Sequence, residues 1–91
     1  MTLPENIAHS KFAIMIPAQS RGARALLNWS QPELAEASGV SISTVRDFET
    51  GKRNPIGNNL AAMRAALEGA GVLFIEENGE GAGVRLKKAK R

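Results

Sequence analysis

The chain has 91 residues, contains no cysteine and carries a net charge of +3. This length supports one folded domain, the missing cysteines exclude disulfides and thiolate zinc sites, and no apolar run approaches the roughly 18 residues that span a bilayer. Five of the last seven residues are basic, and without them seven basic residues face nine acidic ones, which leaves a net charge of −2. The total charge therefore indicates no particular partner, and we expect a cytoplasmic protein.

Residues 1–16 show no clear hydrophobic period, and we expect them to form an N-terminal arm. A helix is predicted from Pro17, because the missing N–H of proline costs nothing in a first turn. It is predicted to stop at Asn28, a residue type that tolerates the left-handed conformation found at helix ends. The apolar stripe of this helix consists of Ala23, Leu26 and Leu27.

A second helix is predicted to begin at Ser30. Ser30 and Glu33 form an S-x-x-E capping box, in which each side chain accepts a hydrogen bond from the other residue's backbone N–H. The helix should end at Gly39, since glycine readily adopts the positive φ of a sharp turn. The side chains predicted to be buried are those of Leu34, Ala35 and Ala37.

A third, short helix is predicted to begin after Ser41 and to end near Thr50. At about 100° per residue, Val45 and Phe48 fall on one side of it. The opposite side carries short hydroxyls, a guanidinium, a carboxylate and one apolar side chain: Ile42, Ser43, Arg46, Asp47 and Thr50. These types suit the edges of DNA bases, because serine and arginine donate hydrogen bonds, aspartate accepts one from cytosine, and an apolar group contacts the thymine methyl. The alternative is an ordinary solvated surface.

A fourth helix is predicted to run from residues 58–59 to Gly71. The pattern of apolar residues then changes from that of a helix to that of strands. Two strand-like segments near residues 72–76 and 83–87, separated by a glycine-rich loop, predict a β-hairpin. A hairpin on its own is only marginally stable in water. We therefore expect it to pair with the same hairpin of a second subunit or with the segment 11–16. The basic tail that follows is either solvated, which we favour, or a nonspecific contact to phosphate.

The stretch from Trp29 to Arg53 reads WSQPELAEASGVSISTVRDFETGKR, and it resembles the helix-turn-helix of the phage repressor and Cro (XRE) family. The family pattern is S-Q-x-x-L-A-x-x-x-G-V-S-x-x-x-V-x-x-[FWIL]-E-x-G. It is filled by Ser30, Gln31, Leu34, Ala35, Gly39, Val40, Ser41, Val45, Phe48, Glu49 and Gly51. The resemblance implies a mainly α, compact four- to five-helix bundle over residues 17–71, whose third helix lies in the major groove of DNA. Residues 72–91 would follow as a β-hairpin, our candidate for dimerisation, and a basic tail.

The resemblance also implies roles for individual side chains. Those that would read bases are Ile42, Ser43, Arg46 and Asp47. Those that would contact phosphates are Gln31, Ser41, Thr44, Lys52 and Arg53. An ion pair between Arg24 and Glu49 is implied as a structural element. Ile42 departs from the family, which often has glutamine at this position, and this reduces readout by hydrogen bonds.

These features predict a sequence-specific transcriptional regulator, a repressor or autoregulator, that binds double-stranded DNA in the nucleoid as a homodimer. An alternative of a different class is a protein-binding module, such as an antitoxin or antiactivator, for which the exposed Ile42 and the acidic body are suited. An enzyme ranks last, because the sequence has no nucleophile–base pair and no metal-ligand spacing. We expect no catalytic residue, no cofactor, no metal and no contact with a membrane.

Overall fold

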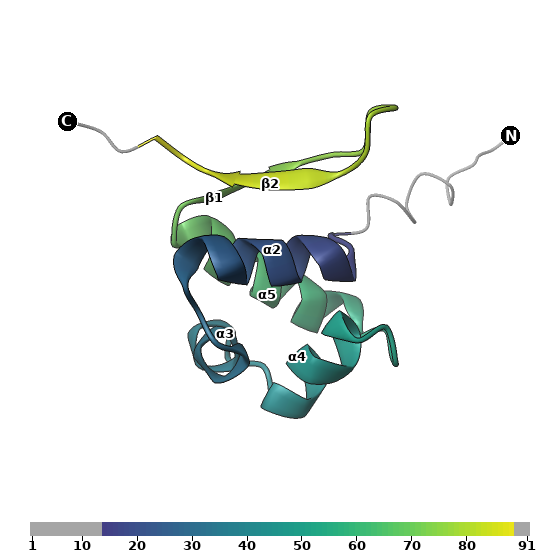
Figure 1. The fold of residues 1–91 in the computed structure, drawn as a ribbon. Helices are drawn as coiled ribbons and strands as arrows, with labels where there is room; N and C mark the ends of the chain where they lie inside the picture. The colour runs from purple at the N-terminus through teal and green to yellow at the C-terminus, as the bar shows by residue number, and fades with distance from the viewer. Residues whose placement is uncertain (1–13, 89–91) are drawn as a thin grey trace, which may run out of the picture.

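The computed structural model describes residues 14–88. Its helices are α2 (Pro17–Leu27), α3 (Gln31–Ser38), α4 (Ile42–Glu49) and α5 (Gly57–Gly69), and its strands are β1 (Val72–Ile75) and β2 (Gly83–Leu86). The predicted mainly helical fold with a C-terminal antiparallel hairpin is confirmed. Figure 1 shows the hairpin lying over α2 and α5, with α3 and α4 on the other side of these two helices. None of the helices between residues 14 and 88 combines the length and the hydrophobicity that a bilayer-spanning segment requires.

Local sequence signals set most of the helix ends where they were predicted. Asn28 ends α2 in the left-handed conformation, with a φ of 62°. Before α3, the Glu33 N–H donates to Ser30 Oγ over 3.2 Å and the Ser30 N–H donates to the Glu33 carboxylate over 2.7 Å, so the capping box is formed. Gly39 ends α3 with a φ of 74°. The exception is α5, which begins at Gly57, slightly earlier than predicted, so that the asparagines expected to start it lie in its first turn.

The core lies between the four helices and the inner face of the hairpin. Its buried apolar residues are Met15, Ala23, Leu34, Ala35, Val40, Val45, Phe48, Met63, Leu67, Val72 and Phe74. Met15 belongs to the expected arm, so residues 14–16 pack on the bundle, while residues 1–13 lie outside the described part of the chain. The prediction that Ala37 is buried is wrong, because the inner stripe of α3 continues instead through Ser38, whose hydroxyl donates to Leu34 O over 2.7 Å.

The hairpin packs against α2 and α5 of its own chain, a contact that the hydrophobic pattern of the sequence did not predict. Val72 and Phe74 of β1 are buried, with exposed fractions of 1% and 7%. The buried amide of Gln19 in α2 donates to Ile75 O over 3.3 Å and to Gly83 O over 3.0 Å, and so joins both strands to the helix. The hairpin therefore has a packing partner within the chain, independent of a second subunit or of the segment 11–13, which lies outside the described residues.

Arg64 of α5 contacts both the hairpin and the residues that precede α2. Its guanidinium donates to Ile14 O over 2.5 Å, to Glu68 over 2.9 Å and to Glu76 over 3.1 Å. It also lies 4.5 Å from the ring centre of Phe74. A single side chain thus contacts the entry to α2, the end of α5 and the end of β1.

We expect Arg64→Met, which keeps the aliphatic stem, to lower the free energy of unfolding by about 1–2 kcal/mol, through lost cation–π and hydrogen-bond interactions. Urea unfolding followed by circular dichroism measures this loss. Lys52→Ala, which removes an exposed cation elsewhere, is the control and should change the free energy by less than about 0.5 kcal/mol. Equal effects of the two substitutions would contradict the proposed role of Arg64.

Candidate nucleic-acid interface

A tight turn at Gly39 and Val40 connects α3 to α4. Gly39 and Val40 both donate their N–H groups to Ala35 O, over 2.9 and 3.2 Å. Val40 is buried beneath the turn, and the small side chain of Ala35 is 9% exposed where the two helices meet. Because Gly39 has a positive φ, the chain turns sharply between the two helices, and α3 and α4 pack against each other.

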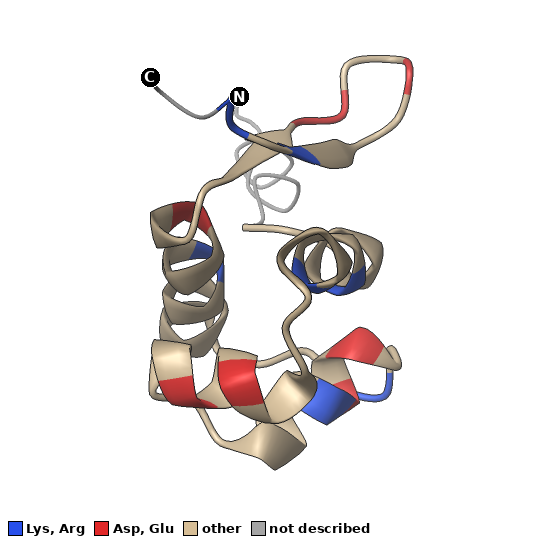
Figure 2. Cartoon of the chain, turned by 60° about the vertical axis from the view of Figure 1, so that its left-hand side comes forward, with Lys and Arg blue, Asp and Glu red and all other residues tan. Residues whose placement is uncertain are grey.

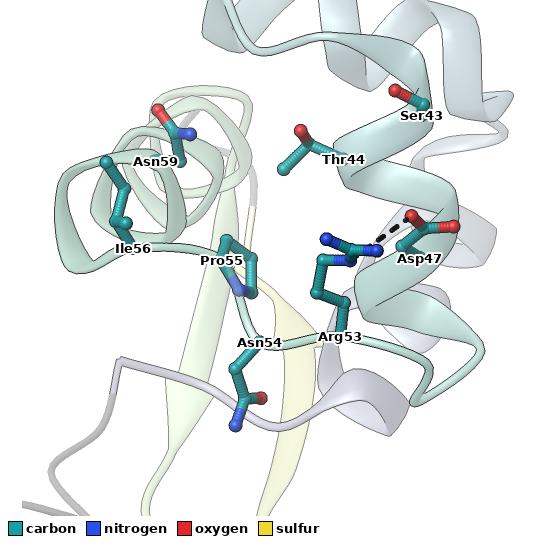
Figure 3. A pocket seen from close by; sticks show the side chains of 8 residues that line it. All are labelled: Ser43, Thr44, Asp47, Arg53, Asn54, Pro55, Ile56 and Asn59. Carbon is teal, nitrogen blue, oxygen red and sulfur yellow. Dashed lines mark ion pairs between the residues drawn. The ribbon is translucent and has the colours of Figure 1, made fainter.

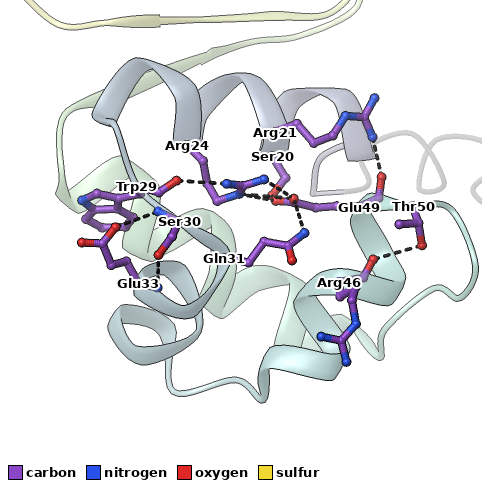
Figure 4. Close-up of polar contacts among 10 residues, drawn as sticks. All are labelled: Ser20, Arg21, Arg24, Trp29, Ser30, Gln31, Glu33, Arg46, Glu49 and Thr50. Atoms are coloured by element: carbon purple, nitrogen blue, oxygen red, sulfur yellow. Dashed lines mark hydrogen bonds and ion pairs between the residues drawn. The ribbon is translucent and has the colours of Figure 1, made fainter.

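One side of α4 is buried and the other is open, as its period predicted. Val45 and Phe48 have exposed fractions of 0% and 2% and hold the helix in the core. Ile42 is 38% exposed, and Ser43 and Arg46 are also exposed. The Arg46 guanidinium points away from α2 and α3 (Figure 4). This exposed side of α4 can therefore meet a second molecule without any rearrangement of the core.

A buried carboxylate ties the end of α4 to α2 and α3. Glu49 has a side-chain exposure of 1%, and its Oε1 lies 2.7 Å from Arg24 Nη2, so the ion pair expected between these residues is present. Ser20 donates to Glu49 Oε2 over 2.5 Å, and Gln31 donates to Oε1 over 3.1 Å. Arg24 also donates to Trp29 O over 2.9 Å. Figure 4 shows these contacts converging between the three helices, which fixes the orientation of α4.

The hydrogen bonds keep this carboxylate charged. Burial alone would raise the pKa of Glu49, but the bonds from Arg24, Ser20 and Gln31, with the charge of Arg24, together lower that pKa below its ordinary value. On the other side of the pair, the hydrogen bond to Glu49 raises the pKa of Arg24. Both groups are therefore ionised at neutral pH, and the pair is a charged structural element.

A hollow of about 510 Å³ lies beside the exposed side of α4. Its lining residues are Ser43, Thr44, Asp47, Arg53, Asn54, Pro55, Ile56 and Asn59. Figure 3 shows the side chains of α4 on one side of the hollow and those of residues 53–59 on the other. Across it, Arg53 Nε lies 3.8 Å from Asp47 Oδ2. Sequence reasoning missed Asn54 and Asn59 here, although the asparagines around the start of α5 were a visible signal.

Charge is unevenly distributed around α3 and α4. Figure 2 shows acidic residues on α3, both basic and acidic residues in the C-terminal half of α4, and basic residues in the loop that follows. Lys52 and Arg53 in this loop are exposed, and their N–H groups donate to Asp47 O over 2.8 and 3.2 Å, which places the loop against the helix. Since Glu49 is buried and Asp47 is paired with Arg53, the exposed charges that an anionic partner would meet here are those of Arg46, Lys52 and Arg53.

Most of the predicted site residues lie on α4 or directly beside it in the chain. Those on or beside α4 are Ser41, Ile42, Ser43, Thr44, Arg46, Asp47, Lys52 and Arg53. Ser41 caps α4, accepting from the Thr44 N–H over 3.2 Å while its hydroxyl donates to Thr44 Oγ1. Gln31 differs from the rest because one N–H of its amide is directed into the Glu49 network, leaving only the other for an outside ligand.

A helix presented in this way, after a tight turn and on a helical bundle, defines a helix-turn-helix protein. The family model for the helix-turn-helix matches residues 21–69, more than half of the chain, and the chain belongs to this family, in its phage repressor and Cro (XRE) form. It is therefore a DNA-binding regulator of the XRE kind. A search of the curated proteins found no match.

Proposed function

We propose that the chain is a sequence-specific transcriptional regulator, a repressor or autoregulator, that binds operator half-sites as a homodimer. The observation that carries this proposal is the exposed side of α4, with Ile42, Ser43 and Arg46 open to solvent on a helix whose other side is fixed in the core. Such a helix can enter the major groove and present its side chains to base edges. The chain would act by occupying DNA in the cytoplasm.

Each side chain of the interface has a proposed role. Ile42, Ser43 and Arg46 would read bases together with Asp47, and Arg46 is the group able to bond guanine O6 and N7 at once. Contacts to phosphates would set the position and orientation of the chain along the DNA. The side chains proposed for these contacts are Gln31, Ser41, Thr44, Lys52 and Arg53.

Dimerisation matters because one subunit offers few cations to phosphate. Few phosphate contacts would leave a monomer close to the roughly 10⁻⁴–10⁻⁶ M class of nonspecific binders. A twofold dimer presents two copies of α4 roughly 34 Å apart to half-sites on one side of the duplex. The hairpin is the proposed dimerisation element. Because Val72 and Phe74 are part of the core, deletion of residues 72–91 would disturb the bundle, and substitutions at exposed hairpin positions are the better test.

Selection of random duplexes on the pure protein, followed by gel shifts at several salt concentrations, tests the proposed function. We expect one recovered sequence with two related half-sites, and an affinity that falls steeply as salt rises because counterions are released from phosphates. A scrambled duplex of the same composition is the control and should bind on the order of a thousandfold more weakly. Recovery of no common sequence would contradict the proposal.

The second candidate is a protein-binding module, such as an antitoxin or antiactivator. It is favoured by Ile42, an apolar side chain that is 38% exposed, and by Glu33 and Glu36, which lie exposed on the neighbouring α3. An apolar side chain among charges is common at protein interfaces. Absence of a shifted complex at any salt concentration would favour this candidate over the DNA-binding one.

A further inference from the structure

We propose that a second copy of this chain binds at the open edge of β2, with the two β2 strands antiparallel, so that the two hairpins form one four-stranded sheet. This inference rests on the homodimer of the proposed function and specifies how its subunits meet. Three observations carry it: the free backbone groups of β2, the position of the hairpin relative to α4, and the distribution of charge along the hairpin.

The register of the hairpin determines which backbone groups of β2 are free. Lys87 N donates to Gly71 O over 2.8 Å, and residues pair as Leu73 with Arg85 and Phe74 with Val84. Hydrogen-bonded and non-hydrogen-bonded pairs alternate in an antiparallel ladder, so Arg85 bonds to β1 whereas Val84 and Leu86 do not. The N–H and C=O groups of Val84 and Leu86 therefore point away from β1, in the plane of the sheet, towards the open edge of β2. Among the described residues the sheet has two strands, and no third strand covers this edge.

The layers of the fold favour the edge of the hairpin over its outer face. The hairpin lies on one side of α2 and α5, and α3 and α4 lie on the other, in both views (Figures 1 and 2). Pairing at the edge uses a twofold axis perpendicular to the sheet, which keeps both copies of α4 on the same side of the dimer. Stacking of the two outer faces would place the copies of α4 on opposite sides. Of these two arrangements of the hairpins, edge pairing is the one that presents both helices to one side of a duplex.

The ends of the hairpin carry opposite charges, and antiparallel pairing brings them together. Acidic residues lie in the loop between the strands, and basic residues lie at the far end of β2 (Figure 2). The residues concerned are Glu76, Glu77 and Glu80 in the loop and Arg85, Lys87 and Lys88 at the other end. Pairing through β1 would lack this match, since the segment VLFI has no basic residue. Charge complementarity therefore favours β2 against β2.

Like-charge repulsion selects the register of the two β2 strands. A ladder centred on Arg85 would set Arg85 directly opposite the partner's Arg85, and one centred on Leu86 would set it opposite the partner's Lys87. A ladder centred on Gly83 would extend to Gly81, whose φ of 103° is outside the strand conformation. A ladder centred on Val84 pairs the four residues of β2 with residues 82–85 of the partner and so ends before Gly81. It sets Arg85 opposite Gly83, and Lys88 then lies beyond the ladder on the side of the partner's Glu80. We therefore assign the register with Val84 opposite Val84.

Sedimentation velocity of the DNA-free full chain tests the edge with Leu86→Pro and its matched control Leu86→Ala. Both remove a side chain that is 43% exposed, but only proline removes the outward N–H, and it leaves the bonds to β1 in place. Because each change occurs twice in a dimer, we expect Leu86→Pro to weaken dimerisation on the order of tenfold to a hundredfold and Leu86→Ala by about threefold. Far-UV circular dichroism verifies that both variants are folded.

Charge exchange tests the orientation without disturbing the backbone. Glu80 and Lys88 lie on either side of the four-residue strand β2, which spans roughly 13 Å, so they cannot contact each other within one chain. We expect Glu80→Lys and Lys88→Glu each to weaken the dimer several-fold, and the double variant to recover wild-type dimerisation. If Leu86→Pro does not weaken the dimer and the double charge variant does not recover wild-type dimerisation, pairing at the β2 edge is contradicted, whereas the homodimer itself is not. A chain that is monomeric both free and on DNA overturns both.

Discussion

Replacement of Glu49 by glutamine is expected to lower the free energy of unfolding by about 3–5 kcal/mol, because it leaves the Arg24 guanidinium without its countercharge in a largely buried site. The side chains of Glu49 and Arg24 are only 1% and 18% exposed. A chain of this size has a total stability of roughly 5–14 kcal/mol. Chemical denaturation of the variant should therefore show a fold that has lost a large part of its stability.

The same residue gives the fold an acid sensitivity of defined sign. The pKa of Glu49 in the folded chain lies below its ordinary value of 4.5. The stabilisation is therefore complete above about pH 5 and is lost as the pH falls through 4.5 towards the lowered pKa. Glutamine does not titrate, so the difference in stability between wild type and Glu49→Gln should shrink on acidification.

Glu36→Gln is the matched control for this prediction. Glu36 is exposed on α3, and its replacement should change the free energy of unfolding by less than about 0.5 kcal/mol. Denaturant titrations of the three proteins at several pH values between about 3 and 7 measure both effects. A difference between wild type and Glu49→Gln that is small, or that grows on acidification, would show that the carboxylate does not hold the helices together as a charged group.

The second large effect concerns DNA rather than stability. We expect Arg46→Ala to lower affinity for the selected operator by about 1–3 kcal/mol, roughly 5- to 150-fold, and to relax the base preference at one position of each half-site. The reason is that the exposed guanidinium on α4 can bond guanine O6 and N7 together. Selections repeated with the variant, and competition between operators that differ at that position, measure the change.

Two variants separate reading of bases from contact with phosphate. Arg46→Lys keeps the charge but loses the planar pair of donors, so it should lose base preference while keeping the salt dependence. Lys52→Ala should weaken all sequences by about the same factor and lower the salt slope by about one. The reverse pattern, with a uniform loss for Arg46→Ala and a lost preference for Lys52→Ala, would mean that the two roles are exchanged.

The parts of the fold that follow from local signals could be predicted from the sequence. Asn28, the Ser30–Glu33 capping box and Gly39 act over a few residues, and each is where the chain ends or begins a helix. The two sides of α4 follow from its period alone. The ion pair of Arg24 with Glu49 was expected only through the family resemblance, since 25 residues separate the two partners.

Long-range polar contacts could not be predicted. Gln19 and Ser20 are polar residues on a helix, for which exposure is the ordinary expectation, yet both are buried, one beneath the hairpin and one against Glu49. Hydrophobic periodicity carries no information about such residues. For the same reason, no pattern in the sequence predicted that α2 and α5 form the surface beneath the hairpin, or that Asp47 and Arg53 face each other across a hollow.

Backbone amide NMR spectra of the labelled chain, recorded with and without its selected duplex, test most directly whether the exposed side of α4 contacts DNA. The largest shifts should occur at residues 41–47 and at Lys52 and Arg53, whereas the outward face of the hairpin should change little. Large shifts on the hairpin or on the outer side of α3, with the amides of α4 unchanged, would contradict this assignment.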